Sequence, residues 1–405
     1  MCKRLLNIQY AVQWGINMKQ KVYSRDIILV LAASFFYLAS PMLVTPLITG
    51  FSGSLGASAA LMGMIGGLMN LCALFCRPFV GNLADRVSKY RLSAVGAALM
   101  AVACLGYILA SSPAVVVFSR IVNGVGYACC SVCMSTWLSN LLPKDRIGSG
   151  MGFYGMMNAL AMAVAPAIGV NIYQKLGYHM AFVAALCFSA VILLVIRFMS
   201  DKGEPDNLPQ QGGRQREIRL VDRKVIPVAL IIMLFSLPYC ATQSFLVSYV
   251  ETRALDVNVS LFFPFYAVVL LVLRFALKSL FDRLPFWIFL LGSSTSAFAG
   301  ILLLALMKNN AMLLLAACCM AGGYGIMSSV CQSTAILLAG PGRRGLANST
   351  YYIGLDLGMT LGPVAGGFLF GNVELSLFYP VLLATVPLEL MTYWCFRKTM
   401  RQARQ

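Results

Sequence analysis

The stretch GNLADRVSKYR, residues 81–91, decides the fold expected for this chain. It is a short polar turn between two apolar segments, residues 58–80 and 92–110. A hydrophobic run of about 18 or more residues with few charges is typical of a membrane-spanning helix. Backbone groups in lipid must be hydrogen-bonded within their own segment, so both neighbours of the turn are predicted to be helices. The turn therefore joins two helices that cross a membrane in opposite directions.

The same pattern extends over the whole chain of 405 residues, of which 60% are hydrophobic and 11% are charged. A soluble domain carries about 25% charged residues, so the composition indicates an all-α membrane protein. The longest polar stretch, residues 200–224, is predicted to be a linker between two six-helix domains, residues 26–199 and 225–397. The segments 1–25 and 398–405 flank these domains, and Met18 is a second candidate start. The twelve predicted membrane helices are residues 27–48, 58–80, 92–110, 114–140, 147–172, 178–199, 225–250, 259–281, 285–307, 311–338, 345–370 and 375–396.

The net charge is +17, and its basic residues lie in short loops and tails, so membrane topology explains it better than nucleic-acid binding does. If both termini lie on one side, 25 of the 31 lysines and arginines fall on that side, and Lys175, Arg253 and Lys308 fall on the other. Basic loops stay cytoplasmic, so this bias predicts a multi-pass protein of the inner (plasma) membrane with cytoplasmic termini and linker. We expect the lipid bilayer, and no nucleic acid, as its surroundings. Three arginines remain at membrane depth: Arg77, Arg120 and Arg274.

An internal repeat relates the two halves at a constant offset of 197 residues. It pairs Pro41 with Pro238, Arg77 with Arg274, Asp85-Arg86 with Asp282-Arg283, Gly126-Tyr127 with Gly323-Tyr324, Pro166 with Pro363, and Gly169 with Gly366. A slip of one residue adds Val132-Cys133 with Val330-Cys331. Six helices per repeat is an even number, so both halves enter the membrane the same way round. Parallel repeats about an axis along the membrane normal are typical of transporters that work by alternating access.

Residues 81–91 resemble the loop between the second and third helices of the major facilitator superfamily, G-x-L-a-D-r-x-G-r-k, and depart from it at Ser88 and Tyr90. The resemblance covers about residues 26–397. It implies a twelve-helix transporter with pseudo-twofold symmetry, which is not an enzyme and needs no cofactor or metal. We expect a monomer that binds a small-molecule substrate and protons.

The same loop is expected to act as a latch between the two halves. Glycine permits close approach of two helices, and Asp85 fits the positive end of a neighbouring helix, with the eleventh the best candidate. Arg86 and Lys89 are expected to bond carbonyls or acids across the halves. The alternative is a basic loop that only sets topology, which accounts for Lys89 but not for Asp85. The predicted latch consists of Gly81, Asp85, Arg86, Lys89, Asp282 and Arg283.

Two further stretches resemble family motifs. Arg120-x-x-Asn123-Gly124 resembles the helix 4 motif, whose arginine the family assigns to proton coupling; the alternative is an arginine that snorkels to the membrane surface. The fifth segment has the spacing of the family's antiporter motif, associated with exporters, but two glycines are alanines. The eleventh segment repeats the spacing in a better form, and the alternative for both segments is ordinary small-residue packing. These motif residues are Gly152, Ala161, Ala165, Pro166 and Gly169, and Gly358, Gly362, Pro363 and Gly366.

Two acids lie well inside predicted membrane helices. Asp356 lies near mid-span, about 200° around the helix from the glycine stripe at about 100° per residue, so it points away from the packing face. An acid there is a functional candidate, and its alternative role is to pair with a buried arginine or with the latch. Together with Arg120, which would tune Asp356 if the two approach, it is a proton-coupling candidate. Glu389 in the last helix is the third, with a structural role as its alternative.

The function predicted from these features is proton-coupled export of a small organic molecule, and the alternative is an uptake permease for a sugar, nucleoside or organic anion. No acid lies in the first helix, where several proton-coupled drug exporters of the resembled family keep one, and this difference argues against a cationic drug. No phosphate-binding motif or metal-ligand spacing is present, and the one histidine is His179. The polar residues expected to line a substrate cavity, besides Asp356, are Asn70, Asn123, Tyr127, Tyr239, Gln243, Tyr324 and Gln332.

Overall fold

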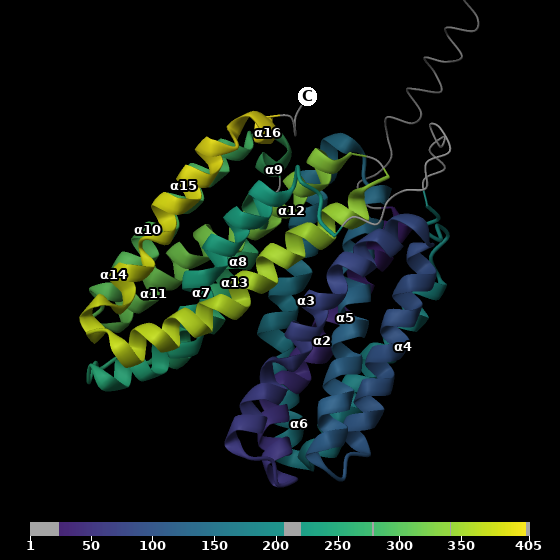
Figure 1. The fold of residues 1–405 in the computed structure, drawn as a ribbon, viewed down its shortest axis with the longest axis horizontal. Coiled ribbons are helices and arrows are strands. Elements are labelled where there is room, and N and C mark those ends of the chain that lie inside the picture. The colour runs from purple at the N-terminus through teal and green to yellow at the C-terminus, as the bar shows by residue number, and fades with distance from the viewer. Residues whose placement is uncertain (1–23, 206–219, 278, 341, 402–405) are drawn as a thin grey trace, which may run out of the picture.

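A computed structural model describes residues 24–205, 220–277, 279–340 and 342–401, and these residues form helices without any strand (Figure 1). The predicted N-terminal segment, most of the linker and the end of the C-terminal tail lie outside the described residues. The helices of the first half are α2 (Arg25–Ser54), α3 (Ala59–Arg86), α4 (Lys89–Ile108), α5 (Pro113–Leu141) and α6 (Ile147–Arg197).

The element α6 contains two of the predicted helices. Its backbone leaves the helical conformation at Gly177, where φ is 83° and ψ is 177°. Glycine adopts a positive φ at little cost, whereas other residues rarely do. The chain therefore turns at this residue, and the fifth and sixth crossings lie before and after it.

The second half follows the same order with more interruptions. The predicted eighth helix, 259–281, is broken into three pieces, and the last predicted helix, 375–396, is broken near Leu383. The elements of this half are α7 (Ile226–Thr252), η2 (Val259–Leu261), α8 (Phe262–Ala276), α9 (Leu280–Arg283), α10 (Phe286–Ala305), α11 (Asn310–Met320), η3 (Ala321–Gly325), α12 (Ile326–Ala339), α13 (Arg344–Asn372), η4 (Leu375–Leu377), α14 (Phe378–Leu382), α15 (Thr385–Cys395) and α16 (Arg397–Arg401).

Ten stretches within the described residues are long and apolar enough to cross a membrane. One of them, Lys144–Arg197, holds two crossings because of the turn at Gly177. The helix Phe262–Ala276 is apolar but shorter than the rest. Counting these together gives the twelve crossings predicted from the sequence, and the all-α membrane fold is confirmed.

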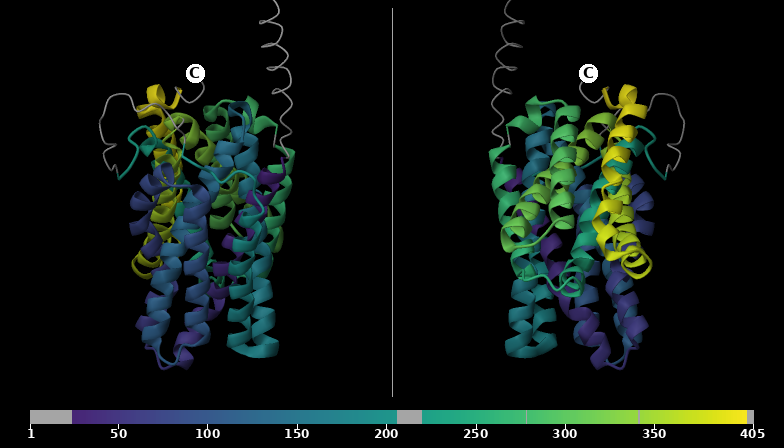
Figure 2. Two further views of the ribbon diagram at one scale, coloured as in Figure 1. Left: turned by 90° about the vertical axis from the view of Figure 1, so that its right-hand side faces the viewer. Right: turned by 90° about the vertical axis from the view of Figure 1, so that its left-hand side faces the viewer.

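The two halves form separate bundles, which are tilted relative to each other (Figures 1 and 2). They meet at the end where α16 lies and diverge toward the opposite end (Figure 1). We call the joined end, which carries the turns at residues 87–88, 142–146 and 284–285, the basic end. Equivalent details recur in both halves: the hydroxyls of Thr45 and Thr242 each donate to the carbonyl of a proline four residues earlier, at 2.8 Å.

A π-helical turn explains the one-residue slip in the internal repeat. The described residues Ala321–Gly325 form this turn between α11 and α12. A π turn accommodates a single inserted residue within an otherwise α-helical segment. The offset is 197 at Tyr324 and 198 at Val330, so the extra residue falls where the helix widens.

The described start of the linker is docked on the turn between α3 and α4. The Ser88 hydroxyl donates to the carbonyl of Lys202 at 2.6 Å, and the Lys89 amide donates to that of Gly203 at 2.9 Å. Ser88 has a φ of −53°, which any residue can adopt. The departure from the family pattern at this position therefore costs no backbone strain, and it adds a contact to the linker.

Candidate functional site

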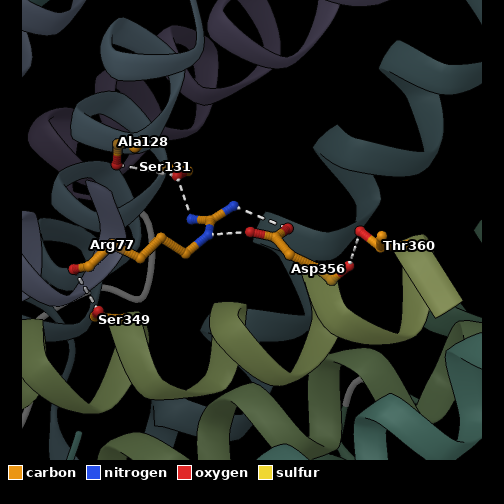
Figure 3. Close-up of polar contacts among 6 residues, drawn as sticks. All are labelled: Arg77, Ala128, Ser131, Ser349, Asp356 and Thr360. Carbon is orange, nitrogen blue, oxygen red and sulfur yellow. Dashed lines mark hydrogen bonds and ion pairs between the residues drawn. The ribbon is translucent and has the colours of Figure 1, made fainter. Parts of the chain in front are cut away.

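A buried ion pair joins the two halves between α3 and α13 (Figure 3). The guanidinium of Arg77 donates from Nε to Oδ2 of Asp356 and from Nη2 to Oδ1, the second bond at 3.1 Å. The third nitrogen, Nη1, donates to the hydroxyl of Ser131 at 2.9 Å. Arg77 is 1% exposed and Asp356 is 5% exposed. This two-pronged geometry is the strong form of an arginine–carboxylate contact.

The ion pair lies near the middle of its helices. Asp356 is the thirteenth residue of α13, about 18 Å from the start of that helix at about 1.5 Å per residue. The hydroxyl of Ser349, two turns earlier, donates to the backbone carbonyl of Arg77 at 2.5 Å (Figure 3). The α3–α13 contact thus continues from the ion pair to the basic end.

Aromatic and amide side chains extend this contact into a polar network across the halves. The Arg77 guanidinium lies 4.3 Å from the centre of the Tyr352 ring, a cation–π distance. The Tyr352 hydroxyl bonds that of Tyr154 at 2.9 Å and accepts from Nε2 of Gln332 at 3.1 Å. Tyr154 also bonds the hydroxyl of Tyr37. Any movement that parts the halves here must exchange several hydrogen bonds at once.

A cavity of about 460 Å³ lies between the halves, directly against the ion pair. Six of the seven polar residues expected to line it do so, and Asp356 does as well. Its charged lining, among the described residues, consists of Arg77, Arg274 and Asp356. These six lining residues are Asn70, Tyr127, Tyr239, Gln243, Tyr324 and Gln332.

Asn123 does not line this cavity, so that expectation is wrong. Its side chain is 0% exposed, and both its amide atoms lack a hydrogen-bond partner among the described residues. It lies one turn from Arg120 on α5. Tyr127 lies one turn further along the same face of α5 and does line the cavity, so the position of Asn123 along the helix keeps it out of the lining.

Arg120 is buried against α3 rather than near Asp356. Its Nε and Nη2 donate to the backbone carbonyls of Ile65 at 3.0 Å and Gly66 at 2.9 Å. The arginine paired with Asp356 is Arg77, as in the alternative role of Asp356 as a buried arginine's partner, and the condition under which Arg120 would tune Asp356 is not met here. From the sequence, Arg77 is an arginine at membrane depth and the repeat partner of Arg274. A charged side chain inside a membrane is energetically unfavourable unless it is paired. This rule is the signal in the sequence that indicates a partner for Arg77.

Glu389 also lies outside the cavity lining. It is 0% exposed on α15, and its Oε2 accepts from the Ser294 hydroxyl of α10 at 3.0 Å. This contact stays within the second half. The geometry favours the structural alternative for Glu389 over proton coupling.

Two carboxylates close the basic end in a symmetric manner. Asp85 accepts from the backbone N–H groups of Gly345 at 2.7 Å and Leu346 at 3.0 Å, at the start of α13. Its repeat partner Asp282 accepts from the N–H of Ser149 at 2.9 Å, at the start of α6. Position 149 lies 197 residues before Leu346, so the two contacts are equivalent. The placement of Asp85 at the positive end of the eleventh helix is confirmed.

The other residues of the predicted latch lie around this contact. Gly81 permits a close approach, since a Cβ atom there would lie 2.4 Å from Cβ of Ser349. Lys89 donates from Nζ to the carbonyl of Glu204 in the linker at 3.4 Å. Arg86 and Arg283 are exposed at the ends of α3 and α9. An unforeseen contact is Arg344, which donates from Nη1 to the carbonyl of Ser139.

The small-residue stripes pack within their own halves. A Cβ atom at Gly169 would lie 2.4 Å from the carbonyl of Leu43 on α2, and one at Gly362 would lie 2.7 Å from that of Leu237 on α7. Gly152 instead faces Phe281 of the other half, at 3.1 Å from a Cβ there. Ala161 and Ala165 are fully buried. Gly358 and Gly366 face α7, and Pro166 lines the cavity.

The family model of the Major Facilitator Superfamily matches residues 29–363. The chain belongs to the major facilitator superfamily. Its members are transporters, not enzymes, so this superfamily protein binds a small-molecule substrate.

Similar proteins agree with this assignment. An uncharacterised MFS-type transporter of Methanocaldococcus jannaschii is 22% identical over 348 residues, which cover 80% of this chain and 86% of that protein. A multi-drug resistance efflux pump PmrA homolog of Lactococcus lactis is 24% identical over 179 residues, 43% of this chain and 44% of that protein. The crystal structure of the human organic anion transporter MFSD10 has a TM-score of 0.67 at 17% identity, and covers 91% of this chain and 98% of that chain. That likeness shows the shared superfamily fold.

Proposed function

We propose that this superfamily transporter is proton-coupled and exports a small organic molecule by alternating access, with Asp356 carrying the proton. The observation behind the proposal is the Arg77–Asp356 ion pair. It is a contact between the halves that a single proton would break, and it lies against the cavity. Binding of a solute and binding of a proton would thus act on one set of side chains.

We infer that the basic end faces the cytoplasm of a cell whose plasma membrane holds the protein. The bias of lysine and arginine supports this orientation. The cavity would then lie on the outer side of the closed contacts made by Asp85, Asp282 and Ser349. The conformation seen here corresponds to a state closed toward the cytoplasm.

The proposed cycle begins when a proton from outside binds Asp356. A neutral Asp356 no longer attracts Arg77, which keeps its contacts to Ser131 and to the Tyr352 ring. The halves are then free to part at the basic end, where the proton leaves and the substrate enters. Re-formation of the ion pair closes that end again with the substrate in the cavity. One proton moves inward for each cycle of export.

The similarity to an efflux pump homolog supports export, and so does the small-residue stripe of α6 that packs on α2. The alanines at positions 161 and 165, where the exporter pattern has glycine, leave the uptake alternative open. The two directions differ in the sign of the proton movement. In exchange, protons move in the direction opposite to the solute. In co-transport, protons move in the same direction as the solute.

The test uses proteoliposomes that contain the purified chain and a trapped pH-sensitive dye. Each member of a panel of cationic, neutral and anionic solutes is applied as a gradient, and the internal pH is followed. We expect at least one solute to drive protons in the direction opposite to its own flow. Proton movement in the same direction would establish the uptake alternative. Solute counterflow without any proton movement would exclude proton coupling.

The orientation has its own test. We expect a reporter that is active only in the cytoplasm to be active when fused after Lys224 or after Gln405, because both positions follow the positive-inside bias. The matched comparison is a fusion after Lys308, in a turn at the end opposite the basic end. A reporter active only outside the cytoplasm should show the reverse pattern. Activity of this second reporter after Lys224 would contradict the proposed topology.

A further inference from the structure

The second buried arginine of the cavity, Arg274 of α8, lacks the counter-ion that its repeat partner has. Its residue exposure is 3%, and it lines the cavity. Nη2 donates to the carbonyl of Gly325 at 2.9 Å and to the hydroxyl of Ser328 at 3.0 Å. Nε and Nη1 have no hydrogen-bond partner, and within the described part of the chain no carboxylate lies within 4.0 Å.

The missing counter-ion follows from a break in the internal symmetry. Arg77 receives the Tyr352 ring and the Asp356 carboxylate from α13. The same offset of 197 residues makes Gly155 and Ala159 of α6 the equivalents of Tyr352 and Asp356 for Arg274. Neither position has the interacting group: glycine has no side chain, and alanine has only a methyl group. The chain therefore keeps both arginines of the repeat but only one of the two acids.

The helix that should supply the acid still approaches Arg274 closely. A Cβ atom at position 155 would lie 2.5 Å from Nη1 of Arg274 and 2.4 Å from Oγ of Ser329. That Ser329 hydroxyl is buried and has no hydrogen-bond partner in the part of the structure described. Gly155, Ser329 and Arg274 all line the cavity. Unused donors of two side chains are thus gathered at one place on the cavity wall.

A buried guanidinium without a counter-ion is unfavourable. It has lost its hydration, and no attraction to an anion offsets that loss. The cavity lining as a whole carries two arginines and one aspartate, a net positive charge. The same wall holds the stacked rings of Tyr239 and Tyr324, whose centres lie 4.5 Å apart. These rings offer a flat apolar surface next to the charge.

We propose that Arg274 is the anion-binding residue of the cavity and that the substrate is a small organic anion. Its carboxylate, phosphate or sulfonate group accepts hydrogen bonds from Arg274 and Ser329, and its body lies against Tyr239 and Tyr324. The ligand then supplies the negative charge that Asp356 supplies to Arg77. This inference rests on the proposed function, in which the cavity is the transport site. Binding can nevertheless be measured without transport.

The test measures binding of matched probes to the purified full-length chain in detergent, by the ligand-induced rise in unfolding temperature. The probes are benzoate and benzamide, glucuronate and glucuronamide, phenyl phosphate and phenol, and toluenesulfonate and toluenesulfonamide. We expect the anion of at least one pair to bind, and its neutral partner to bind about tenfold or more weakly. Failure of every anion to bind, or equal binding of a neutral partner, overturns the proposal.

Three variants separate anion binding from folding. Arg274→Gln should lower anion affinity about tenfold or more and raise the unfolding temperature of the ligand-free protein, because it removes an uncompensated charge. Ala159→Asp should lower anion affinity with Arg274 intact, because it restores the acid of the repeat. Lys308→Gln, an exposed cation away from the cavity, should change neither. A structural role for Arg274 predicts the opposite, a lower unfolding temperature with unchanged anion affinity in the Arg274→Gln protein.

The outcome is distinguishable from that of the proposed function. Anion binding that depends on Arg274, without any proton movement in proteoliposomes, sustains the anion site and excludes proton coupling. Proton movement driven only by cationic or neutral solutes sustains the coupled transporter and overturns the anion site.

Discussion

Asp356→Asn should abolish accumulation of solute against its gradient. It should leave the exchange of solute between equal pools on the two sides of the membrane in place. The substitution removes the proton-binding group and leaves Arg77 buried without an acid. Breaking one partner of a buried pair costs about 3–5 kcal/mol, so a loss of stability of that size should accompany the loss of coupling. The measurement is uptake into proteoliposomes with and without a pH gradient, using a solute identified by the panel described above.

A double variant distinguishes coupling from folding. Arg77→Gln combined with Asp356→Asn replaces the ion pair by two neutral amides, so no buried charge remains unpaired. We expect it to recover most of the lost stability and the exchange activity, but not the accumulation. If the double variant accumulates solute with normal pH dependence, Asp356 does not carry the proton.

Glu389→Gln is the matched control for a buried acid outside the cavity. It removes a carboxylate that bonds Ser294 within one half, and it leaves every contact between the halves unchanged. We expect normal accumulation and normal pH dependence. If the Glu389→Gln protein loses accumulation and pH dependence while the Asp356→Asn protein keeps them, Glu389 rather than Asp356 carries the proton.

Asp85→Asn should shift the protein toward states that are open at the basic end. The asparagine can accept only through one neutral oxygen, so the charge-assisted bonds to Gly345 and Leu346 are weakened. A carboxylate at a partly buried helix N-terminus contributes up to about 2 kcal/mol. This corresponds to a shift of up to about 25-fold in the closed-to-open ratio at about 1.4 kcal/mol per factor of ten. Net transport should fall while membrane insertion and solute binding remain.

Hydrogen exchange of the affected amides measures this shift directly. The N–H groups of Gly345 and Leu346 should exchange faster in Asp85→Asn, and that of Ser149 should follow if the two contacts open together. Asp85→Asn combined with Asp282→Asn should have the larger effect. Normal transport and unchanged exchange in the double variant would reduce both acids to topology signals.

Asp26→Asn is the control for removing a carboxylate that accepts from two backbone N–H groups, as Asp85 does. Asp26 also accepts from two backbone N–H groups, those of Ser200 at 3.1 Å and Asp201 at 2.9 Å, but within one half. We expect it to leave the exchange of Gly345 and Leu346 unchanged. Faster exchange there in this variant would indicate general destabilisation rather than opening between the halves.

The sequence by itself determined the twelve crossings, the repeat and the placement of Asp85 at the start of the eleventh helix. These features are properties of local hydrophobicity, of charge and of a constant spacing along the chain, and Asp85 shows how far they reach. A carboxylate in a polar turn beside a helix start has few alternatives, so its partner could be predicted. The six lining residues were found for a similar reason, because polar side chains within apolar helices avoid lipid.

Only the tertiary structure decided which charges meet. Arg77 and Asp356 are 279 residues apart, and no spacing rule links them, because their contact exists only where α3 of one half docks on α13 of the other. The sequence named Arg120 as the arginine that would tune Asp356 if the two approach, and it placed Arg77 and Arg274 only at membrane depth. Packing gave Arg77 the carboxylate, gave Arg120 the carbonyls of α3, and left Arg274 facing a glycine. An unpaired charge is defined by what is missing around it in three dimensions, and the order of residues along the chain does not contain that information.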